Sequence, residues 1–100
     1  MPNKKTKNPK RWFTVAYLTR EGQPHPAHRH ENFTQRYCTR KILMEDLIHS
    51  MIHWSRGAHV AGAWPGQISE WEVLHGNTNP LFYVHENGSI ELIPGELAIS

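Results

Sequence analysis

Histidine is the residue type with the greatest chemical capacity in this sequence, since eight of the 100 residues are histidines. His49 and His53 lie four positions apart in a helical pattern, a spacing that presents two imidazoles to one metal ion. Asp46 falls on the same helical face and could orient or join them. That face is polar with Ile42 as the main exception, and the glutamate of a His-Glu-x-x-His peptidase motif is missing. A solvated helix face therefore explains the pair, and we predict no metal and no cofactor.

A second group of histidines, His25, His28 and His30, lies in a stretch interrupted by glycine and prolines. His28, His30 or Cys38 could complete a zinc site with the helical pair, but nothing after the cluster resembles an HNH nuclease pattern. Cys38 precedes the predicted helix, whose dipole could lower the thiol pKa, or it is simply a small buried residue. The sequence has no glycine-rich phosphate loop, nucleophile elbow or paired catalytic carboxylates. We predict that the protein is not an enzyme, and a zinc-dependent or histidine-based nuclease is the catalytic alternative.

The charge of the chain is divided unevenly along its length. All eleven Lys and Arg lie in residues 1–56, and residues 57–100 contain five Glu and no basic residue. Such asymmetry favours a charged macromolecular partner, although a solubilising tail explains it equally well. Five of the basic residues lie in the first eleven positions, and they are Lys4, Lys5, Lys7, Lys10 and Arg11.

This basic segment is followed directly by Trp12 and Phe13. Basic residues beside aromatic residues can contact phosphates and stack on bases. The sequence thus predicts, as an alternative function, a small nucleic-acid-binding domain that uses its N-terminal arm. In the competing interpretation, Trp12 and Phe13 simply pack within a first strand.

Trp64 is the candidate anchor for a protein partner. It lies in residues 57–66, a stretch of small apolar residues without periodicity, and is followed by Pro65 and Gly66. An exposed tryptophan in a loop can dominate binding energy, whereas a buried one would form a lid over the helix. The neighbouring Gly and Ala residues are too small to fix one isomer of the Trp64–Pro65 bond by packing. We therefore expect a mobile loop, with Trp64 at least partly exposed and Trp64, Pro65 and Gly66 available to a partner protein or a prolyl isomerase.

One amphipathic helix over residues 40–56 organises the rest of the chain. Six apolar residues fall on one stripe at helical spacing, and they are Leu43, Met44, Leu47, Ile48, Met51 and Trp54. Thr39 or Thr34 can cap the start of the helix, and Gly57 lies where a left-handed residue would end it.

Strands are predicted at residues 11–19, 69–75, 81–86 and 89–93, because aromatic and β-branched residues alternate there with polar ones. Residues 21–32 contain glycine and prolines without periodicity and are predicted as a loop.

The last two strands are predicted to form a hairpin over residues 81–93. Asn87-Gly88 suits a two-residue type I′ turn, which would place Val84 opposite Glu91.

These elements together predict a flexible basic arm at residues 1–10 and a single domain at residues 11–100. The fold class is α+β, with one amphipathic helix packed on a small antiparallel sheet in the order β-α-β-β-β. No apolar run approaches the ~20 residues that span a bilayer, and no signal peptide is evident. A single cysteine fits a reducing compartment. We expect a cytoplasmic protein without membrane contact.

In overall character the chain resembles the short early proteins of temperate phages. The likeness consists of a hundred-residue α+β chain, a lysine-rich start, no enzymatic motif and the Trp64-Pro65-Gly66 stretch. Among these proteins it is similar to the anti-RecBCD proteins of P22-like phages. The resemblance implies binding to the host RecBCD helicase–nuclease in the bacterial cytoplasm and altered handling of DNA ends. It carries over no site residue, because it contains no diagnostic motif. The principal functional prediction is a non-enzymatic interaction protein that binds and modulates a larger host protein.

Overall fold

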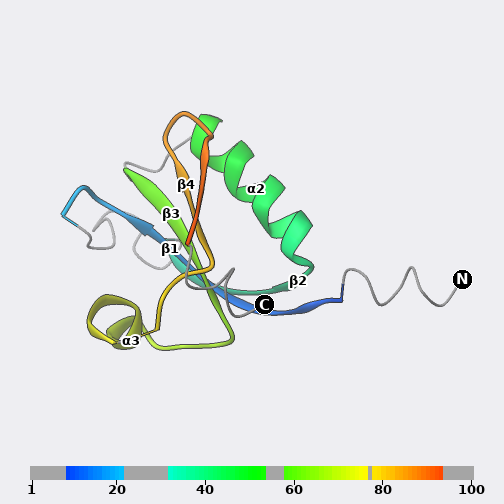
Figure 1. The fold of residues 1–100 in the computed structure, drawn as a ribbon, viewed down its shortest axis with the longest axis vertical. Coiled ribbons are helices and arrows are strands. Elements are labelled where there is room, and N and C mark those ends of the chain that lie inside the picture. Colours follow the sequence, from blue (N-terminus) through cyan, green and yellow to red (C-terminus); the bar gives the residue numbers. More distant parts are fainter. Residues whose placement is uncertain (1–8, 22–31, 54–57, 77, 94–100) are drawn as a thin grey trace, which may run out of the picture.

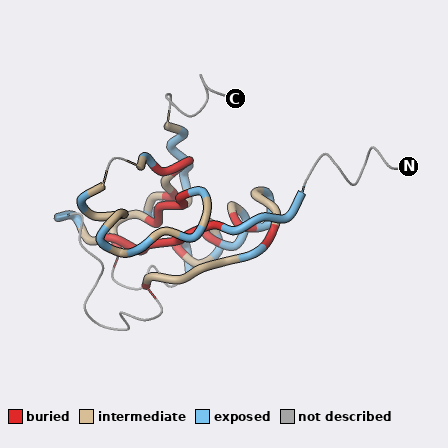
Figure 2. The backbone as a smooth tube through the Cα atoms, turned by 90° about the horizontal axis from the view of Figure 1, so that it is seen from below, coloured by how far each residue is buried: buried red, intermediate tan, exposed pale blue. Residues whose placement is uncertain are grey.

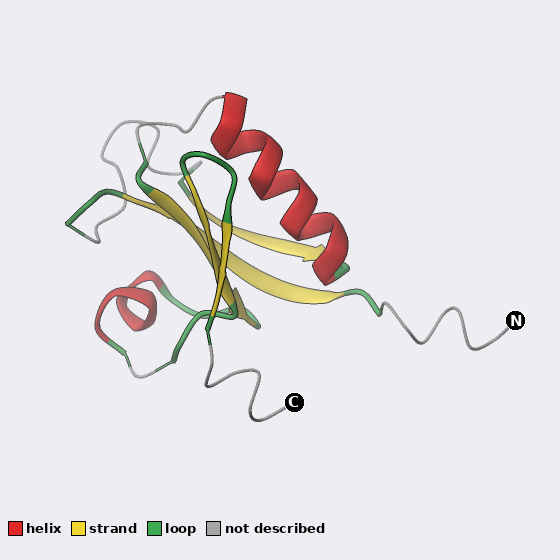
Figure 3. Ribbon diagram, turned by 45° about the horizontal axis from the view of Figure 1, so that its top comes forward, coloured by secondary structure: helices red, strands yellow, loops and turns green. Residues whose placement is uncertain are grey.

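The computed structural model describes residues 9–21, 32–53, 58–76 and 78–93. Its elements are β1 (Arg11–Leu18), β2 (Phe33–Cys38), α2 (Arg40–His53), β3 (Val60–Pro65), α3 (Glu70–His75), β4 (Phe82–His85) and β5 (Ile90–Leu92). The strands form one antiparallel sheet in the order β2-β1-β3-β4-β5 (Figure 1). Helix α2 covers one face of this sheet, and α3 lies on the other side (Figure 3).

The predicted α+β class, with one amphipathic helix on an antiparallel sheet, is confirmed. The order β-α-β-β-β is present in β1, α2, β3, β4 and β5, and the fold adds β2 and α3 to it. Within the described ranges, no helix is long and apolar enough to cross a membrane. Several predictions concern residues outside these ranges, namely the arm at residues 1–8, the loop histidines His25, His28 and His30, and the helix end at Trp54 and Gly57.

Helix α2 has the predicted apolar stripe. Leu43, Leu47 and Met51 are buried, and Met44 and Ile48 pack against the same core while partly exposed. Thr39 caps the helix, because its Oγ1 accepts a hydrogen bond from the backbone N–H of Ile42 at 3.2 Å. The stripe therefore faces the sheet as the sequence predicts.

Strand β1 lies inside the sheet, and its alternating side chains supply both hydrophobic clusters. Phe13, Val15 and Tyr17 belong to the core beneath α2, which also contains residues of β4. Ala16 and Leu18 point to the opposite face and belong to a smaller cluster. Apart from its first two residues, β1 is a continuous buried run through the middle of the molecule (Figure 2).

Strand β3 corrects the prediction of an irregular stretch at residues 57–66. It pairs with β1 on one side and β4 on the other, so it lies inside the sheet. Ala61 and Ala63 are buried in the core beneath α2, where larger side chains would compete with the helix for space. Gly62 lies on the opposite face against the ring of Trp64. Because both faces are packed, with Ala61 and Ala63 on one and Gly62 and Trp64 on the other, the sequence shows no alternation of apolar and polar residues.

Residues 69–75 form α3 for most of their length, so the strand predicted there is wrong. Oγ of Ser69 accepts a hydrogen bond from the backbone N–H of Glu72 at 3.1 Å, which caps the first turn. Ser69 and Glu72 also have the spacing of a capping box, a signal of a helix start. In the predicted strand Trp71 would alternate with the two glutamates and face the core, but on this helix Trp71 is 65% exposed.

The β4–β5 hairpin forms, but its register differs by one residue from the predicted one. Val84 pairs with Ile90 rather than with Glu91. The turn contains a third residue, Glu86, besides Asn87 and Gly88, and Gly88 adopts a φ of 89°. A three-residue loop with a left-handed last residue is a common hairpin alternative to the type I′ turn. The shift moves each β5 side chain to a new cross-strand neighbour.

Candidate functional site

Trp64 lies in the core of the smaller cluster and is 2% exposed, so the predicted exposed loop is wrong. Its indole N–H donates a hydrogen bond to the carbonyl oxygen of Thr78 at 3.0 Å. Its ring meets the ring of Tyr83 edge to face, with centroids 6.4 Å apart. Pairing of β3 with β1 holds Trp64 in this position, and the bond to Pro65 is trans.

The other two residues of the predicted protein-binding stretch are more accessible. Pro65 is exposed, and Gly66 is partly exposed with a φ of 80°. Gly66 also donates its backbone N–H to the carbonyl oxygen of Trp12 at 2.9 Å, which ties it to β1. The role of this stretch in binding a partner stays a prediction, now without a surface tryptophan.

The basic segment continues into β1, where the two aromatic residues diverge. Lys10 and Arg11 are exposed, whereas Lys4, Lys5 and Lys7 lie outside the described residues. Phe13 is fully buried beneath α2, while Trp12 points to the other face and is 42% exposed. One of the two aromatics therefore packs, as the competing interpretation holds, and the other lies at the surface.

Trp12 has an exposed aromatic neighbour that the sequence did not predict. Tyr37 of β2 lies directly opposite Trp12 in the β1–β2 register and is 56% exposed. The two ring centroids are 5.3 Å apart, and the rings are tilted by 48°. We call these two side chains the aromatic pair. The available signal was the β-branched and aromatic content of residues 33–38, which were not assigned to a strand.

A buried hydrogen-bond network supports the sheet beside the aromatic pair. The hydroxyl of Thr14, which is fully buried, lies 2.8 Å from the carbonyl oxygen of Gly66 and 3.0 Å from Oε1 of Gln35. It accepts the backbone N–H of Ile68 at 2.9 Å. Gln35 in turn donates from Nε2 to the carbonyl oxygen of Ile68 at 3.2 Å. These bonds join β1, β2 and the segment after β3, so the pair rests on a well-connected part of the sheet.

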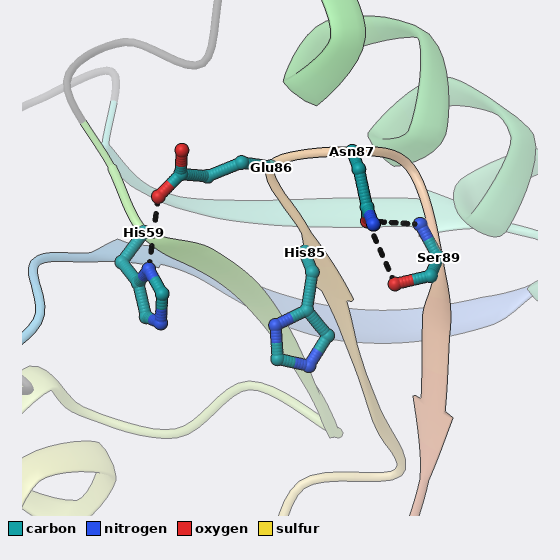
Figure 4. A pocket seen from close by; sticks show the side chains of 5 residues that line it. All are labelled: His59, His85, Glu86, Asn87 and Ser89. Atoms are coloured by element: carbon teal, nitrogen blue, oxygen red, sulfur yellow. Dashed lines mark hydrogen bonds and ion pairs between the residues drawn. The ribbon is translucent and has the colours of Figure 1, made fainter.

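A second feature that the sequence did not predict lies at the opposite end of β1. A hollow of about 450 Å³ is lined by His59, His85, Glu86, Asn87 and Ser89 (Figure 4). A neighbouring hollow of about 210 Å³ shares His59 and His85 with it. The two histidines are 26 positions apart in sequence and meet because Val60 pairs with His85 across β3 and β4.

Each of these histidines is hydrogen-bonded to a glutamate. Nδ1 of His59 lies 2.9 Å from Oε2 of Glu86, and Nε2 of His85 lies 2.9 Å from Oε1 of Glu91. The two imidazole rings are nearly perpendicular, with centroids 6.1 Å apart. The contact with Glu91 exists because the observed hairpin register places Glu91 beside His85 on one face of the sheet. We call these four side chains the His–Glu cluster.

The charge of the His–Glu cluster is set mainly by its carboxylates. The hydrogen bond from His59 lowers the pKa of Glu86, and the nearby charge of Arg20 lowers it further against an opposing effect of burial. A guanidinium nitrogen of Arg20 lies 3.5 Å from Glu86 Oε2. Glu86 is therefore ionised at neutral pH, and the cluster attracts cations rather than anions.

Among the described residues, the histidine and cysteine candidates from the sequence do not form one site. His49 and His53 are exposed on α2, as predicted, with ring centroids 4.3 Å apart. Cys38 is buried, and burial raises the pKa of its thiol, which favours its interpretation as a small core residue. In the described part of the chain, no group of three or more His, Cys, Asp or Glu residues is placed to hold a metal ion.

No protein-family model, curated protein or solved structure matches this chain.

Proposed function

We propose that this protein binds single-stranded nucleic acid through the aromatic pair and the basic residues that precede it. The observation that carries the proposal is the position of Trp12 and Tyr37, two exposed rings side by side on the sheet, with Lys10 and Arg11 directly before Trp12 in the chain. Aromatic rings offer stacking surfaces for bases, and each stacked base contributes about 1–3 kcal/mol. The lysine residues of the arm and the adjacent Arg11 supply contacts to phosphates.

The exposed rings favour a single strand over a duplex. In a duplex the faces of the bases are already covered by neighbouring bases, so a protein ring can stack only on a base that is unpaired or unstacked. The aromatic pair lies on an open part of the sheet rather than on a helix that could enter a groove. These features support recognition by stacking and charge, with little dependence on sequence.

A direct binding measurement tests this proposal. Fluorescence anisotropy with labelled oligo(dT) and oligo(rU) should show binding, and a duplex of the same length should bind more weakly. Trp12→Ala and Tyr37→Ala should each weaken binding by about 5- to 150-fold, the equivalent of removing one stacked base. Trp71→Ala is the matched control, because Trp71 is 65% exposed on α3 and lies outside the pair. Equal losses of affinity in all three variants, or no loss in the first two, would contradict the proposal.

The contribution of the arm to nucleic-acid binding is measured separately, from the dependence of the affinity on salt concentration. Removal of residues 1–10 deletes Lys4, Lys5, Lys7 and Lys10, so the dependence of affinity on salt concentration should become shallower. For single strands the slope of log K against log salt changes by about 0.7 for each phosphate that the protein no longer neutralises. An unchanged slope would mean that the arm does not bind phosphates.

A protein partner is the second candidate function, and the exposure of Trp71 favours it. A tryptophan that is 65% exposed on a capped helix can anchor an interface, the role that the sequence analysis gives to Trp64. We keep the non-enzymatic binding of a larger host protein, RecBCD in particular, as this second proposal. Purified RecBCD immobilised on a sensor surface gives its test: Trp71→Ala should weaken binding by more than about tenfold. No binding of the unaltered protein would exclude RecBCD as the partner.

A further inference from the structure

The hydrogen bonds of the His–Glu cluster fix which nitrogen of each imidazole is available to a ligand. An ionised carboxylate can only accept, so the ring nitrogen beside each glutamate must carry the proton. His59 therefore donates from Nδ1 to Glu86, and His85 donates from Nε2 to Glu91. In the neutral rings this leaves a lone pair on Nε2 of His59 and on Nδ1 of His85. Among the described residues, neither of these nitrogens has a hydrogen-bond partner.

This arrangement has the features of histidines that bind metal ions. A metal-binding imidazole typically donates its second ring N–H to a carboxylate, which fixes the tautomer and raises the basicity of the metal-binding nitrogen. Here the pattern occurs twice, on rings that belong to adjacent strands. Two imidazoles that bind one zinc ion at about 2.0–2.1 Å have ring centres roughly 5–6 Å apart. The observed separation of the His59 and His85 centroids is 6.1 Å, slightly more than this spacing, so the two rings would have to approach one another to share one ion.

We propose that His59 and His85 bind a divalent transition-metal ion of the zinc class, with Glu86 and Glu91 orienting the two rings. Imidazole nitrogens suit zinc, copper and nickel ions better than magnesium or calcium, which prefer oxygen ligands. Among the described residues, no group of three or more His, Cys, Asp or Glu is placed to hold a metal ion, and the two carboxylates are already hydrogen-bonded to the imidazoles. The protein thus supplies two ligands there, and the hollow of about 450 Å³ leaves room for water at the remaining positions.

Charge separates this site from the proposed nucleic-acid surface. Two carboxylates and one guanidinium surround the histidines, so a phosphate group would meet net negative charge. A cation is favoured for the same reason. The inference therefore stands independently of the proposed function, because it uses other residues at the opposite end of β1.

Zinc chloride added to the full chain, observed by long-range ¹H–¹⁵N NMR of the histidine rings, tests the proposal. The resonances of His59 and His85 should shift together and saturate at one equivalent of zinc. His49 and His53 form the competing pair on α2, with ring centroids 4.3 Å apart, and their resonances should change only at higher zinc concentration. Shifts confined to that pair or to the other histidines, or no shifts at all, would overturn the proposal.

Variants then separate the ligands from the residues that orient them. By calorimetry, His85→Ala or His59→Gln should weaken zinc binding by at least about tenfold, while a double variant with His49→Ala and His53→Ala should retain it. Glu91→Ala should weaken it by about 10- to 100-fold, the usual effect of removing a carboxylate behind a ligand. Zinc should also raise the melting temperature of the unaltered protein but not that of His85→Ala. Retained affinity in both His85→Ala and His59→Gln, with folding verified by circular dichroism, would refute the assignment.

Discussion

Gly62 leaves the space that the indole ring of Trp64 occupies, since a Cβ at position 62 would lie 2.7 Å from Cζ3 and 2.8 Å from Cη2 of that ring. The two residues are neighbours on one face of β3, where the backbone of a glycine permits the ring to lie flat against the strand. On the opposite face of β3, Ala61 and Ala63 pack in the core beneath α2. β3 is therefore a strand whose small residues are required by what lies on each side of it.

Substitution of this glycine should destabilise the fold through crowding. Gly62→Ala places a methyl group against the Trp64 ring, so we expect the free energy of unfolding to fall by about 1–3 kcal/mol in urea denaturation. In a Trp64→Phe background, where the outer ring atoms are absent, the same substitution should cost less. An equal cost in both backgrounds would mean that the effect of Gly62→Ala does not arise from the ring.

Trp64 and Trp71, whose burial was predicted wrongly from the sequence, should contribute very differently to the free energy of unfolding. Trp64→Ala removes a side chain that is 2% exposed and should lower the free energy of unfolding by about 3–5 kcal/mol. Trp71→Ala removes one that is 65% exposed and should change it by less than about 0.5 kcal/mol. Thermal and chemical denaturation measure both, and a larger loss for Trp71→Ala would reverse the assignment of core and surface.

The face that α2 turns toward the sheet can be tested with two aliphatic substitutions. Leu47→Ala should cost about 2–5 kcal/mol of unfolding free energy, because Leu47 is buried at the centre of the stripe. Ile42→Ala is the matched control on the same helix, where the side chain is 46% exposed, and it should cost less than about 1 kcal/mol. Similar losses in the two variants would show that the helix is rotated relative to the assignment.

The His59–Glu86 contact predicts a contribution to stability that depends on acid pH. Because the folded-state pKa of Glu86 is lowered, its contribution is fully present above the unfolded pKa of about 4.3 and is lost as the pH falls through the folded value. Urea denaturation between pH 6 and pH 3 should therefore show a shallower loss of stability for Glu86→Gln than for the unaltered protein. Identical slopes would mean that the carboxylate has the same pKa in both states.

Periodicity in the sequence predicted the elements whose successive side chains alternate between the core and the solvent. The stripe of α2 alternates between core and solvent once per turn, and β4 alternates once per residue, so both patterns are visible in the sequence. Patterns of this kind are strong because one face of each element meets a single, uniform environment.

The remaining elements depend on competition between local signals or on distant neighbours. In α3 the Ser69 cap outweighs the alternation that predicts a strand, because a capped helix can leave Trp71 exposed while partly burying Val73 and Leu74. In the hairpin one extra turn residue changes the register and brings Glu91 to His85.

The sequence did not predict the aromatic pair or the His–Glu cluster, and the physical reason is the same for both. Trp12 meets Tyr37 only through β1–β2 pairing, and His59 meets His85 only at the β3–β4 boundary. Sequence spacing does not report contacts made across strands that are distant along the chain.

The Thr14 network also predicts which step of folding is slow. Its hydroxyl contacts backbone atoms 52 and 54 positions away, while the β4–β5 hairpin closes only a three-residue loop. Closing the longer loop costs more chain entropy, and contacts at such separation slow folding more than helix or hairpin formation does. We therefore expect α2 and the hairpin to form early and the joining of β1 to β3 to set the refolding rate. In stopped-flow experiments Thr14→Val should slow refolding, whereas a substitution in the hairpin such as Ser89→Ala should leave that rate unchanged.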